Sequence, residues 1–394
     1  MSADGLFPDV VPVLVDPAAG VLLRAHRESD VPGIVAQCRD PETIRWTTVP
    51  TPAGGYGEDE ARAFLEVIPF GWEGGGPYVW AIELLAVDGH PAVPFAGSID
   101  LQPREPGVVE VGFGLHPAAR GRRAMTAALR LVRDHGFDLL GMRAIRWKAA
   151  VGNWASRRTA TAAGFRFDGS ARCLLSHRGE LLDGWQATIT ADDPRVDLSW
   201  PSPPVLTGDR TTLRPFRDAD AGRVVGACGD AETAHWLVSL PQPYGIADAH
   251  RHLEGVREMA AQRTGWAWCV ADTEDRCVGS VSLEGFGGYA RRLEIGYWAH
   301  PDARGRGLVA EAVRLVTAKV AADDLADSVI IRCAAGNHAS RRVAEAAGYV
   351  RNGVQPASEP LGDGTLDDLV LYTREPGQPS ALQRPGGDGG DEVP

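Results

Sequence analysis

The apolar residues of this chain follow the same pattern twice. Short apolar runs at 110–115 and 294–299 each end at a His-Pro pair, which is typical of strands that stop at a turn. Apolar residues at helical spacing follow each run, and further apolar runs at 144–150 and 328–334 predict a second strand in each half. This order of strand, helix and strand predicts an α/β architecture, a mixed sheet with helices on its faces.

The two halves are copies of one another. Residues 110–165 align with residues 294–349 without a gap, and roughly two-fifths of the aligned positions are identical, far more than chance gives. Weaker matches extend the repeat, since the segments that end at Trp46 and Trp236 share the pattern D-x-E-T-x-x-W. We therefore expect four parts, namely an N-terminal domain at 1–190, a proline-rich extended linker at 191–206, a C-terminal domain at 207–374 and a disordered tail at 375–394.

Composition and charge narrow the class of protein. No apolar run approaches the ~20 residues that a membrane-spanning helix needs, and the N-terminus lacks the features of a signal peptide, so we expect a cytoplasmic protein. The six scattered cysteines include no C-x-x-C pair, which favours free thiols over disulfides or metal ligands. A net charge of −12 argues against a nucleic-acid partner; it suits a cationic partner such as an amine, or serves solubility alone.

The turn between strand and helix in the second copy reads R-G-R-G, from Arg304 to Gly307. Glycines at such a turn let backbone N–H groups point towards an anion, the helix start adds its positive end, and flanking arginines can pair with phosphate oxygens. A solvated basic helix start explains the pattern equally well. The turn lacks the G-x-x-x-x-G-K-[ST] and G-x-G-x-x-G patterns, which disfavours Walker-type and dinucleotide sites.

The combination of motifs is more specific. The order H-P-x-A-R-G-R, helix, strand, G-N-x-A-S-R-R and A-A-G-[FY] resembles the GNAT acyltransferase superfamily, and the W…P-x-P and G-x-L-x-D segments are similar to its RimJ/RimL-like branch. The resemblance covers both copies and implies two tandem GNAT domains that use acetyl-CoA as co-substrate. It also implies transfer of an acetyl group to a primary amine by direct attack. Nothing in the sequence indicates a metal site.

By this resemblance, the loop amides of the second copy hold the pyrophosphate of acetyl-CoA. The pantetheine arm then lies between the strands at 294–299 and 328–334, which part from one another. The cofactor-binding residues of this copy are Tyr297, Ala299, Arg304, Gly305, Arg306, Gly307, Leu308, Val309 and Asn337.

The same resemblance supplies candidate catalytic residues. Glu294 is the candidate base that accepts the proton of the amine, and the alternative is a strand-end glutamate that pairs with an arginine. Ser340 is the candidate acid for the departing thiolate, because Ala344 stands where many GNAT enzymes have a tyrosine. The alternative for Ser340, as for Asn337, is a purely structural helix cap.

The first copy keeps most of these residues. Glu110 and Ser156 stand at the two catalytic positions, and the cofactor-binding positions hold Arg120, Gly121, Arg122, Arg123 and Asn153. The loop motif is partly degenerate, because Arg123 replaces a glycine and Met125 replaces a small residue. Either a side chain there blocks the pyrophosphate, or Arg123 adds a phosphate contact while the backbone still fits. The C-terminal copy is therefore the better candidate for catalysis.

The sequence does not identify the acceptor. A protein N-terminus and a small-molecule or antibiotic amine both fit, and in the second case the N-terminal half is a non-catalytic acyl-CoA-binding or structural module. Trp46 and Trp236 lie near the expected acceptor wall, and we expect them to pack in the core rather than to stack on substrate. The chain is either a monomer with pseudo-dimeric halves or a homodimer. We expect no nucleic-acid or membrane partner.

Overall fold

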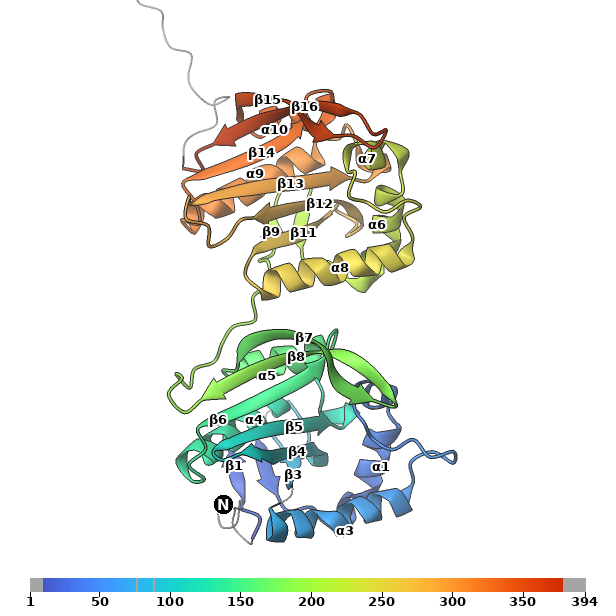
Figure 1. Ribbon diagram of the computed structural model, residues 1–394, viewed down its shortest axis with the longest axis vertical. Helices are drawn as coiled ribbons and strands as arrows, with labels where there is room; N and C mark the ends of the chain where they lie inside the picture. The colour runs from blue at the N-terminus through green and yellow to red at the C-terminus, as the bar shows by residue number, and fades with distance from the viewer. Residues whose placement is uncertain (1–9, 76, 88, 378–394) are drawn as a thin grey trace, which may run out of the picture. The chain divides into compact units, whose positions relative to one another are not determined.

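The computed structural model of this protein describes residues 10–75, 77–87 and 89–377. The chain divides into two compact units between Trp200 and Pro201, coloured blue to green and yellow to red in Figure 1. The expected disordered tail lies outside the described residues from position 378 onwards.

The first unit is a mixed eight-stranded sheet in the order β1-β2-β3-β4-β5-β6-β8-β7, with helices on both faces (Figure 1). Its strands are β1 Leu14–Asp16, β2 Val21–Arg24, β3 Tyr78–Leu84, β4 Val93–Glu105, β5 Val108–Leu115, β6 Ala144–Ala150, β7 Arg166–His177 and β8 Glu180–Thr190. Its helices are α1 Val31–Arg39, α2 Pro41–Trp46, α3 Glu58–Gly74, α4 Ala124–Asp138 and α5 Trp154–Ala162, with 3₁₀ turns at Glu28–Asp30 and Pro117–Ala119.

The second unit repeats the first, with the sheet order β9-β10-β11-β12-β13-β14-β16-β15. Its strands are β9 Leu206–Thr207, β10 Thr212–Arg214, β11 Gly265–Ala271, β12 Cys277–Glu284, β13 Arg292–Ala299, β14 Ser328–Ala334, β15 Val350–Pro360 and β16 Leu366–Arg374. Its helices are α6 Ala221–Cys228, α7 Ala231–Trp236, α8 Ile246–Ala261, α9 Leu308–Ala322 and α10 His338–Ala346, with 3₁₀ turns at Asp218–Asp220 and Pro301–Ala303. The predicted mixed sheets and the duplication are confirmed.

The segment expected to be a linker has no helix or strand between β8 and β9 in the described chain, but its first part is not free. Arg195 pairs with Asp138 of α4 at 2.6 Å, and the Trp200 ring lies 6.2 Å from that of Trp154. This part therefore packs on the first unit instead of spanning open solvent. None of the helices in the described part of the chain combines the length and the apolar composition that a membrane crossing requires.

The central parallel strands of each unit pair over only part of their length. β5 and β6 are in register from Val108 to Val111, and β13 and β14 from Arg292 to Glu294; beyond these residues the strands part, as predicted. The outer neighbours stay paired, since β4 follows β5 to Leu115. A gap in the middle of a sheet leaves backbone N–H and C=O groups for another partner.

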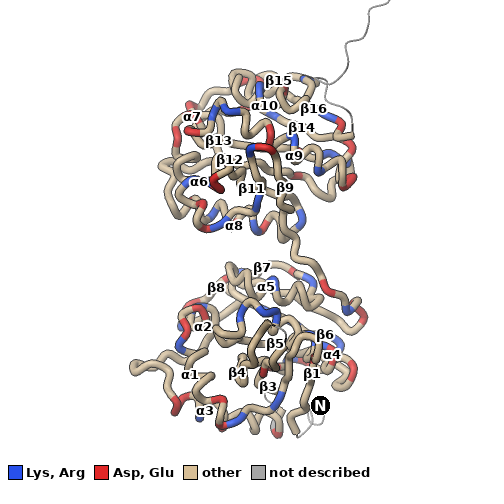
Figure 2. Tube along the Cα trace, turned by 180° about the vertical axis from the view of Figure 1, so that it is seen from behind, with Lys and Arg blue, Asp and Glu red and all other residues tan. Residues whose placement is uncertain are grey.

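Acidic and basic residues are interspersed over each unit (Figure 2), and two arginine–aspartate pairs are buried. Arg24 at the end of β2 binds both carboxylate oxygens of Asp30 at 2.9 Å, and Arg214 binds Asp220 in the same way. Each pair ties the second strand of the sheet to the start of the first helix. Because a charge without its partner is costly in the interior, we expect both members of each pair to be needed.

A second buried contact exists in both units with its partners exchanged. His26 meets Phe64 edge to face at 5.6 Å in the first unit, and Phe216 meets His252 at 5.8 Å in the second. The aromatic contact between the end of the second strand and the long helix is thus kept while the two side chains swap places.

Asp30→Asn tests the buried pair through its pH dependence. Burial alone would raise the pKa of Asp30, but hydrogen bonds from Arg24 and the Arg27 amide hold it below its usual value. Such a carboxylate stabilises the fold above its unfolded pKa of about 4, and that stability is lost as pH falls through the folded pKa. We expect Asp30→Asn to cost about 3 kcal/mol at neutral pH and to flatten the acid dependence of unfolding in urea. Parallel pH profiles for variant and wild type would contradict this assignment.

Candidate active site

The turn that leads into α9 has the backbone of an anion cradle. Gly305 and Gly307 both adopt positive φ, at 71° and 74°. In the described chain, the amides from Gly305 to Ala310 donate to no backbone or side-chain acceptor of the protein. Free amides at a helix start together with the positive end of the helix favour a bound phosphate.

The corresponding turn of the first unit has the same shape despite its different sequence. Gly121 has φ 77°, and Arg123 takes the left-handed conformation of Gly307 with φ 56°, at a cost of about 1 kcal/mol for a residue with a Cβ. The Arg123 side chain is exposed, and Met125 is buried in the core cluster of its unit. The backbone of the first turn therefore keeps the conformation of the second, which agrees with the alternative in which the backbone still fits.

The first arginine of each turn has a structural task. Arg304 donates to Asp230 and to Thr233 Oγ1, and Arg120 donates to Asp40 and to Thr43 Oγ1 in the same way. The two aspartates cap helices α7 and α2, and the arginine beside each lowers its pKa. The expectation that these two side chains pair with phosphate oxygens is corrected accordingly.

Arg210 supplies a cation that the sequence pattern did not indicate. It lies in the turn between β9 and β10, where its Nη1 donates to the Arg306 carbonyl at 2.9 Å and its Nε to Glu311 at 3.0 Å. Its Nη2 lies 3.5 Å from the position that a Cβ of Gly307 would occupy. A guanidinium from outside the loop thus stands beside the glycine that Arg123 replaces in the first unit.

The two candidate bases are both ion-paired. Glu294 binds Arg332 of β14 at 2.9 and 2.8 Å, and Glu110 lies 2.8 Å from Lys148 and 3.1 Å from Arg104. Burial alone would raise the pKa of Glu110, but Lys148 and Arg104 hold it below its usual value. Glu294 therefore pairs with an arginine, as in the alternative weighed from the sequence. Glu110, whose pKa is held low by its two cations, is a weak proton acceptor.

The two candidate acids stand at the starts of α10 and α5. Asn337 Oδ1 accepts from the Ser340 amide at 3.0 Å, so this asparagine is a helix cap. The Ser340 hydroxyl lies 3.0 Å from Tyr297 Oη, which comes from β13 and faces the gap. Burial raises the pKa of Tyr297 well above its usual value, so the phenol stays protonated.

The first unit holds its serine differently. Asn153 caps α5 through the Ser156 amide at 3.2 Å, and the Ser156 hydroxyl accepts a hydrogen bond from Trp147 Nε1 at 3.0 Å. Phe113 takes the place of Tyr297, so no phenol competes for this hydroxyl. A hydroxyl that accepts from an indole keeps its own proton for another acceptor.

Trp46 and Trp236 are half-buried and lie outside the core clusters, so the prediction of core packing is wrong. The Trp46 ring lies 3.5 Å from where a Cβ of Gly152 would be, and Trp236 lies at the same distance from Gly336. Each indole therefore covers the turn before the capping asparagine. The reason the sequence misled is that the short helices carrying these residues pack at the rim of the sheet.

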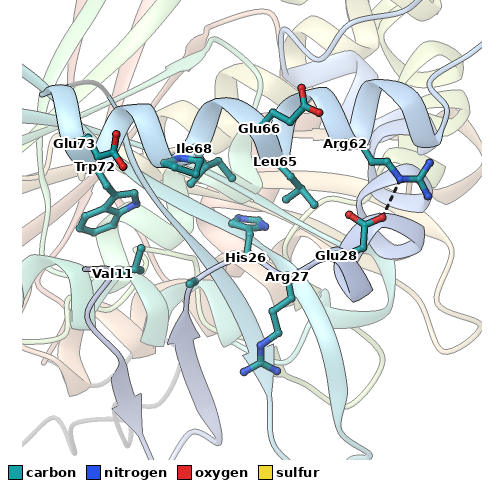
Figure 3. Close-up of a pocket in the computed structure, with 12 residues that line it drawn as sticks. Val11, His26, Arg27, Glu28, Arg62, Leu65, Glu66, Ile68, Trp72 and Glu73 are labelled. Carbon is teal, nitrogen blue, oxygen red and sulfur yellow. Dashed lines mark hydrogen bonds and ion pairs between the residues drawn. The ribbon is translucent and has the colours of Figure 1, made fainter. Parts of the chain in front are cut away.

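A pocket of about 410 Å³ in the first unit lies away from the parted strands (Figure 3). It is formed by α3 and the segment after β2, with Trp72 and Ile68 on one side and the Glu28–Arg62 ion pair at the other end. Strands β3 and β4 separate this pocket from the gap beside β5. We assign it no part in the reaction.

The six cysteines are free, as predicted. In the described chain, Asp220, Cys269 and Cys277 form a buried group within 4.8 Å of one another. Both carboxylate oxygens of Asp220 already bind Arg214, whose positive charge disfavours a cation there, so we read this group as part of the core.

Comparison with known proteins identifies the family of the chain. The model of the acetyltransferase (GNAT) domain matches residues 21–166 and 210–350. The putative ribosomal N-acetyltransferase YdaF of Bacillus subtilis (strain 168) is 32% identical over 170 residues, which are 42% of this chain and 91% of that protein. The ribosomal-protein-serine acetyltransferase of Escherichia coli (strain K12) is 29% identical over 101 residues; the match covers 26% of this chain and spans 56% of that enzyme's length.

Solved structures similar to the chain include Mycobacterium smegmatis RimJ in complex with CoA-disulfide, with 23% identity and a TM-score of 0.39 over 48% of this chain and 90% of that one. Another is the microcin C7 self immunity acetyltransferase MccE in complex with acetyl-CoA and AMP, with 19% identity and a TM-score of 0.39 over 43% of this chain and 93% of that one. The family assignment does not depend on these two likenesses.

Gly307→Glu tests the cradle, in a chain whose first turn already carries Arg123→Glu. The carboxylate repels the pyrophosphate, so we expect acetyl-CoA affinity to fall by at least about tenfold, or ~1.4 kcal/mol, in calorimetry. Gly307→Arg is the matched control, because Arg123 shows that this backbone accepts arginine, and its affinity should stay within about threefold. Unchanged binding in the doubly acidic chain would remove the assignment of the loop.

Proposed function

The chain belongs to the acetyltransferase (GNAT) family, and from that premise we propose that it moves an acetyl group from acetyl-CoA to a primary amine by direct attack on the thioester. It is an N-acetyltransferase of this family, with acetyl-CoA as co-substrate.

Two features occur together in each unit, and this combination supports the proposal most strongly. A gap opens between parallel strands after Val111 and after Glu294, and a turn with free amides lies directly after the strand that borders each gap. The extended arm of acetyl-CoA has amide groups that can complete the hydrogen bonds of the parted strands, while its pyrophosphate sits at the turn. The thioester then lies near the start of the parting.

The reaction needs one group to take a proton and one to give a proton. The amine nitrogen forms a bond to the thioester carbon, the bond from carbon to sulfur breaks, and the amine loses a proton while the thiolate gains one. We assign the role of proton donor to Ser340 and Ser156, whose hydroxyls lie at the helix start beside each gap. Free strand amides stabilise the negative oxygen of the intermediate, and the two reactants gain most from being held together.

For the acceptor we propose the α-amino group of a protein. The names of the two curated relatives, one a ribosomal-protein-serine acetyltransferase and one a putative ribosomal N-acetyltransferase, support a ribosomal protein as the first to try. The net charge of −12 suits a basic partner of that kind through electrostatic attraction.

A thiol assay for coenzyme A release tests the proposal against its rivals. The panel holds N-terminal peptides of ribosomal proteins, aliphatic polyamines and aminoglycosides. Release with the peptides supports the proposal, and release with the aminoglycosides alone replaces the acceptor with a small molecule. Tight acetyl-CoA binding without release on any amine would leave a binding module and would contradict catalysis.

Ser156→Ala together with Ser340→Ala tests the role of the hydroxyls. Both asparagine caps depend on backbone amides and survive, so we expect acetyl-CoA affinity to stay within about twofold while kcat falls by about 10–100-fold. Ser358→Ala in β15, away from the gap, is the control and should leave both quantities unchanged. An equal loss of affinity and turnover in the double variant would identify the serines as structural residues.

A further inference from the structure

Each gap has one side that faces the first helix of its unit. The residues on this side differ between the two units. Register identifies the equivalent positions, since Asp100 lies opposite Gly112 in the first unit and Ser282 lies opposite Gly296 in the second. Two residues further along each strand, on the same face, Gly114 of the first unit corresponds to Trp298 of the second. The first unit thus has a carboxylate and an open position where the second has a hydroxyl and an indole.

The carboxylate of Asp100 lies directly over the point where the strands part. A Cβ built on Gly112 would be only 2.8 and 3.0 Å from its two oxygens, so the group covers the backbone of that glycine. Gly112 is the first residue of β5 beyond Val111, the last residue paired with β6. Asp100 therefore lies where the gap begins, on the face of the sheet opposite α4.

Asp100 is not held in an ion pair in the described chain, unlike Glu110 and Glu294. Its recorded side-chain partner is Gln102, whose Nε2 donates at 2.8 Å, and in the described chain it has no cation within ion-pair distance. Glu110, by contrast, is bound by two cations. Burial raises the pKa of Asp100, and the charge of Glu110 adds to this, while Gln102, the Gly112 amide and Arg104 act in the opposite direction.

A second polar side chain faces the same opening from α1. Gln37 Nε2 lies 3.0 Å from the position of a Cβ on Gly114, and its buried Oε1 has no hydrogen-bond partner in the described chain. A buried amide oxygen without a partner favours a ligand that donates hydrogen bonds. The second unit has Ala227 on the equivalent helix, and its Trp298 packs into the apolar cluster there.

We propose that Asp100 is the catalytic base of the first unit, which binds the acceptor amine as an ammonium ion with the help of Gln37 and takes its proton. This inference rests on the proposed acetyl transfer. The ammonium gives one proton to Asp100, the freed nitrogen pair attacks the thioester carbon, and the carbon–sulfur bond breaks. The second proton passes from the nitrogen to solvent water as the amide forms, and the thiolate takes the proton of Ser156. Ser156 regains a proton from solvent and Asp100 releases its own proton to solvent, so that one proton is released per acetyl group transferred.

The consequence reverses the ranking made from the sequence. The first unit has the carboxylate, the open position and the hydroxyl that a cationic amine needs, whereas the second presents Ser282 and Trp298 at the same places. The acceptor of the first unit accordingly enters as an ammonium ion, as the proposed protein α-amino group does, and its acetyl transfer does not depend on the second unit.

The test uses the full chain with Gly307→Glu and Ser340→Ala, so that the reaction of the second unit is suppressed. In this background we expect Asp100→Asn to lower kcat/KM for a cationic amine by about 100-fold or more, with acetyl-CoA affinity by calorimetry within about threefold. Asp100→Glu should restore part of the rate. Ser282→Ala, at the matching position of the other unit, should leave the rate unchanged.

The pH profile separates a base from a structural carboxylate. The background chain should lose activity on the acidic side as Asp100 becomes protonated, and Asp100→Asn should lack that limb in its residual rate. Wild-type turnover by Asp100→Asn, or a loss of acetyl-CoA binding as large as the loss of rate, overturns the proposal. Absence of coenzyme A release by the unmodified chain overturns the proposed function itself, which is a different result.

Discussion

The parting of two parallel strands is the constraint on which the rest of the structure depends. An unpaired strand edge inside a sheet is unstable unless something holds it open and something fills it. Here the outer neighbours hold it, because β4 stays paired with β5 to Leu115 and β8 stays paired with β6 to Ala150. The strands on each side of the gap are therefore hydrogen-bonded within their own half of the sheet. The turn before α4 or α9 and the cap of α5 or α10 each follow the C-terminal end of one of the two parallel strands, so both lie at the open end of the same gap.

The duplication shows which features this gap requires and which it does not. The left-handed turn survives the replacement of Gly307 by Arg123, and the buried aromatic contact survives an exchange of histidine and phenylalanine. The arginine–aspartate pairs and the asparagine caps are the same in both units. The residues beside the gap that face the first helix differ most, since Asp100 and Gly114 of the first unit correspond to Ser282 and Trp298 of the second.

The sequence predicted the fold well because periodicity and motif order are local properties. The strands at 144–150 and 328–334 are observed to the residue, and Asn153 and Asn337 cap the helices as expected. The strands part as expected, but only after Glu294 and Ile330, which are still paired. The site was harder to predict, since it depends on contacts between distant segments. Whether Glu294 is free depends on Arg332 on the neighbouring strand, and the role of Asp100 depends on the strand register across a gap. The backbone of Arg123 could not be read from a residue type that rarely adopts positive φ.

A crystal structure of the chain with coenzyme A tests the central claim most directly. We expect two molecules per chain, one between β5 and β6 and one between β13 and β14, each with its pyrophosphate at the turn before the following helix. Coenzyme A bound away from both gaps, or strands β5 and β6 closed into a continuous ladder beyond Val111, would contradict it.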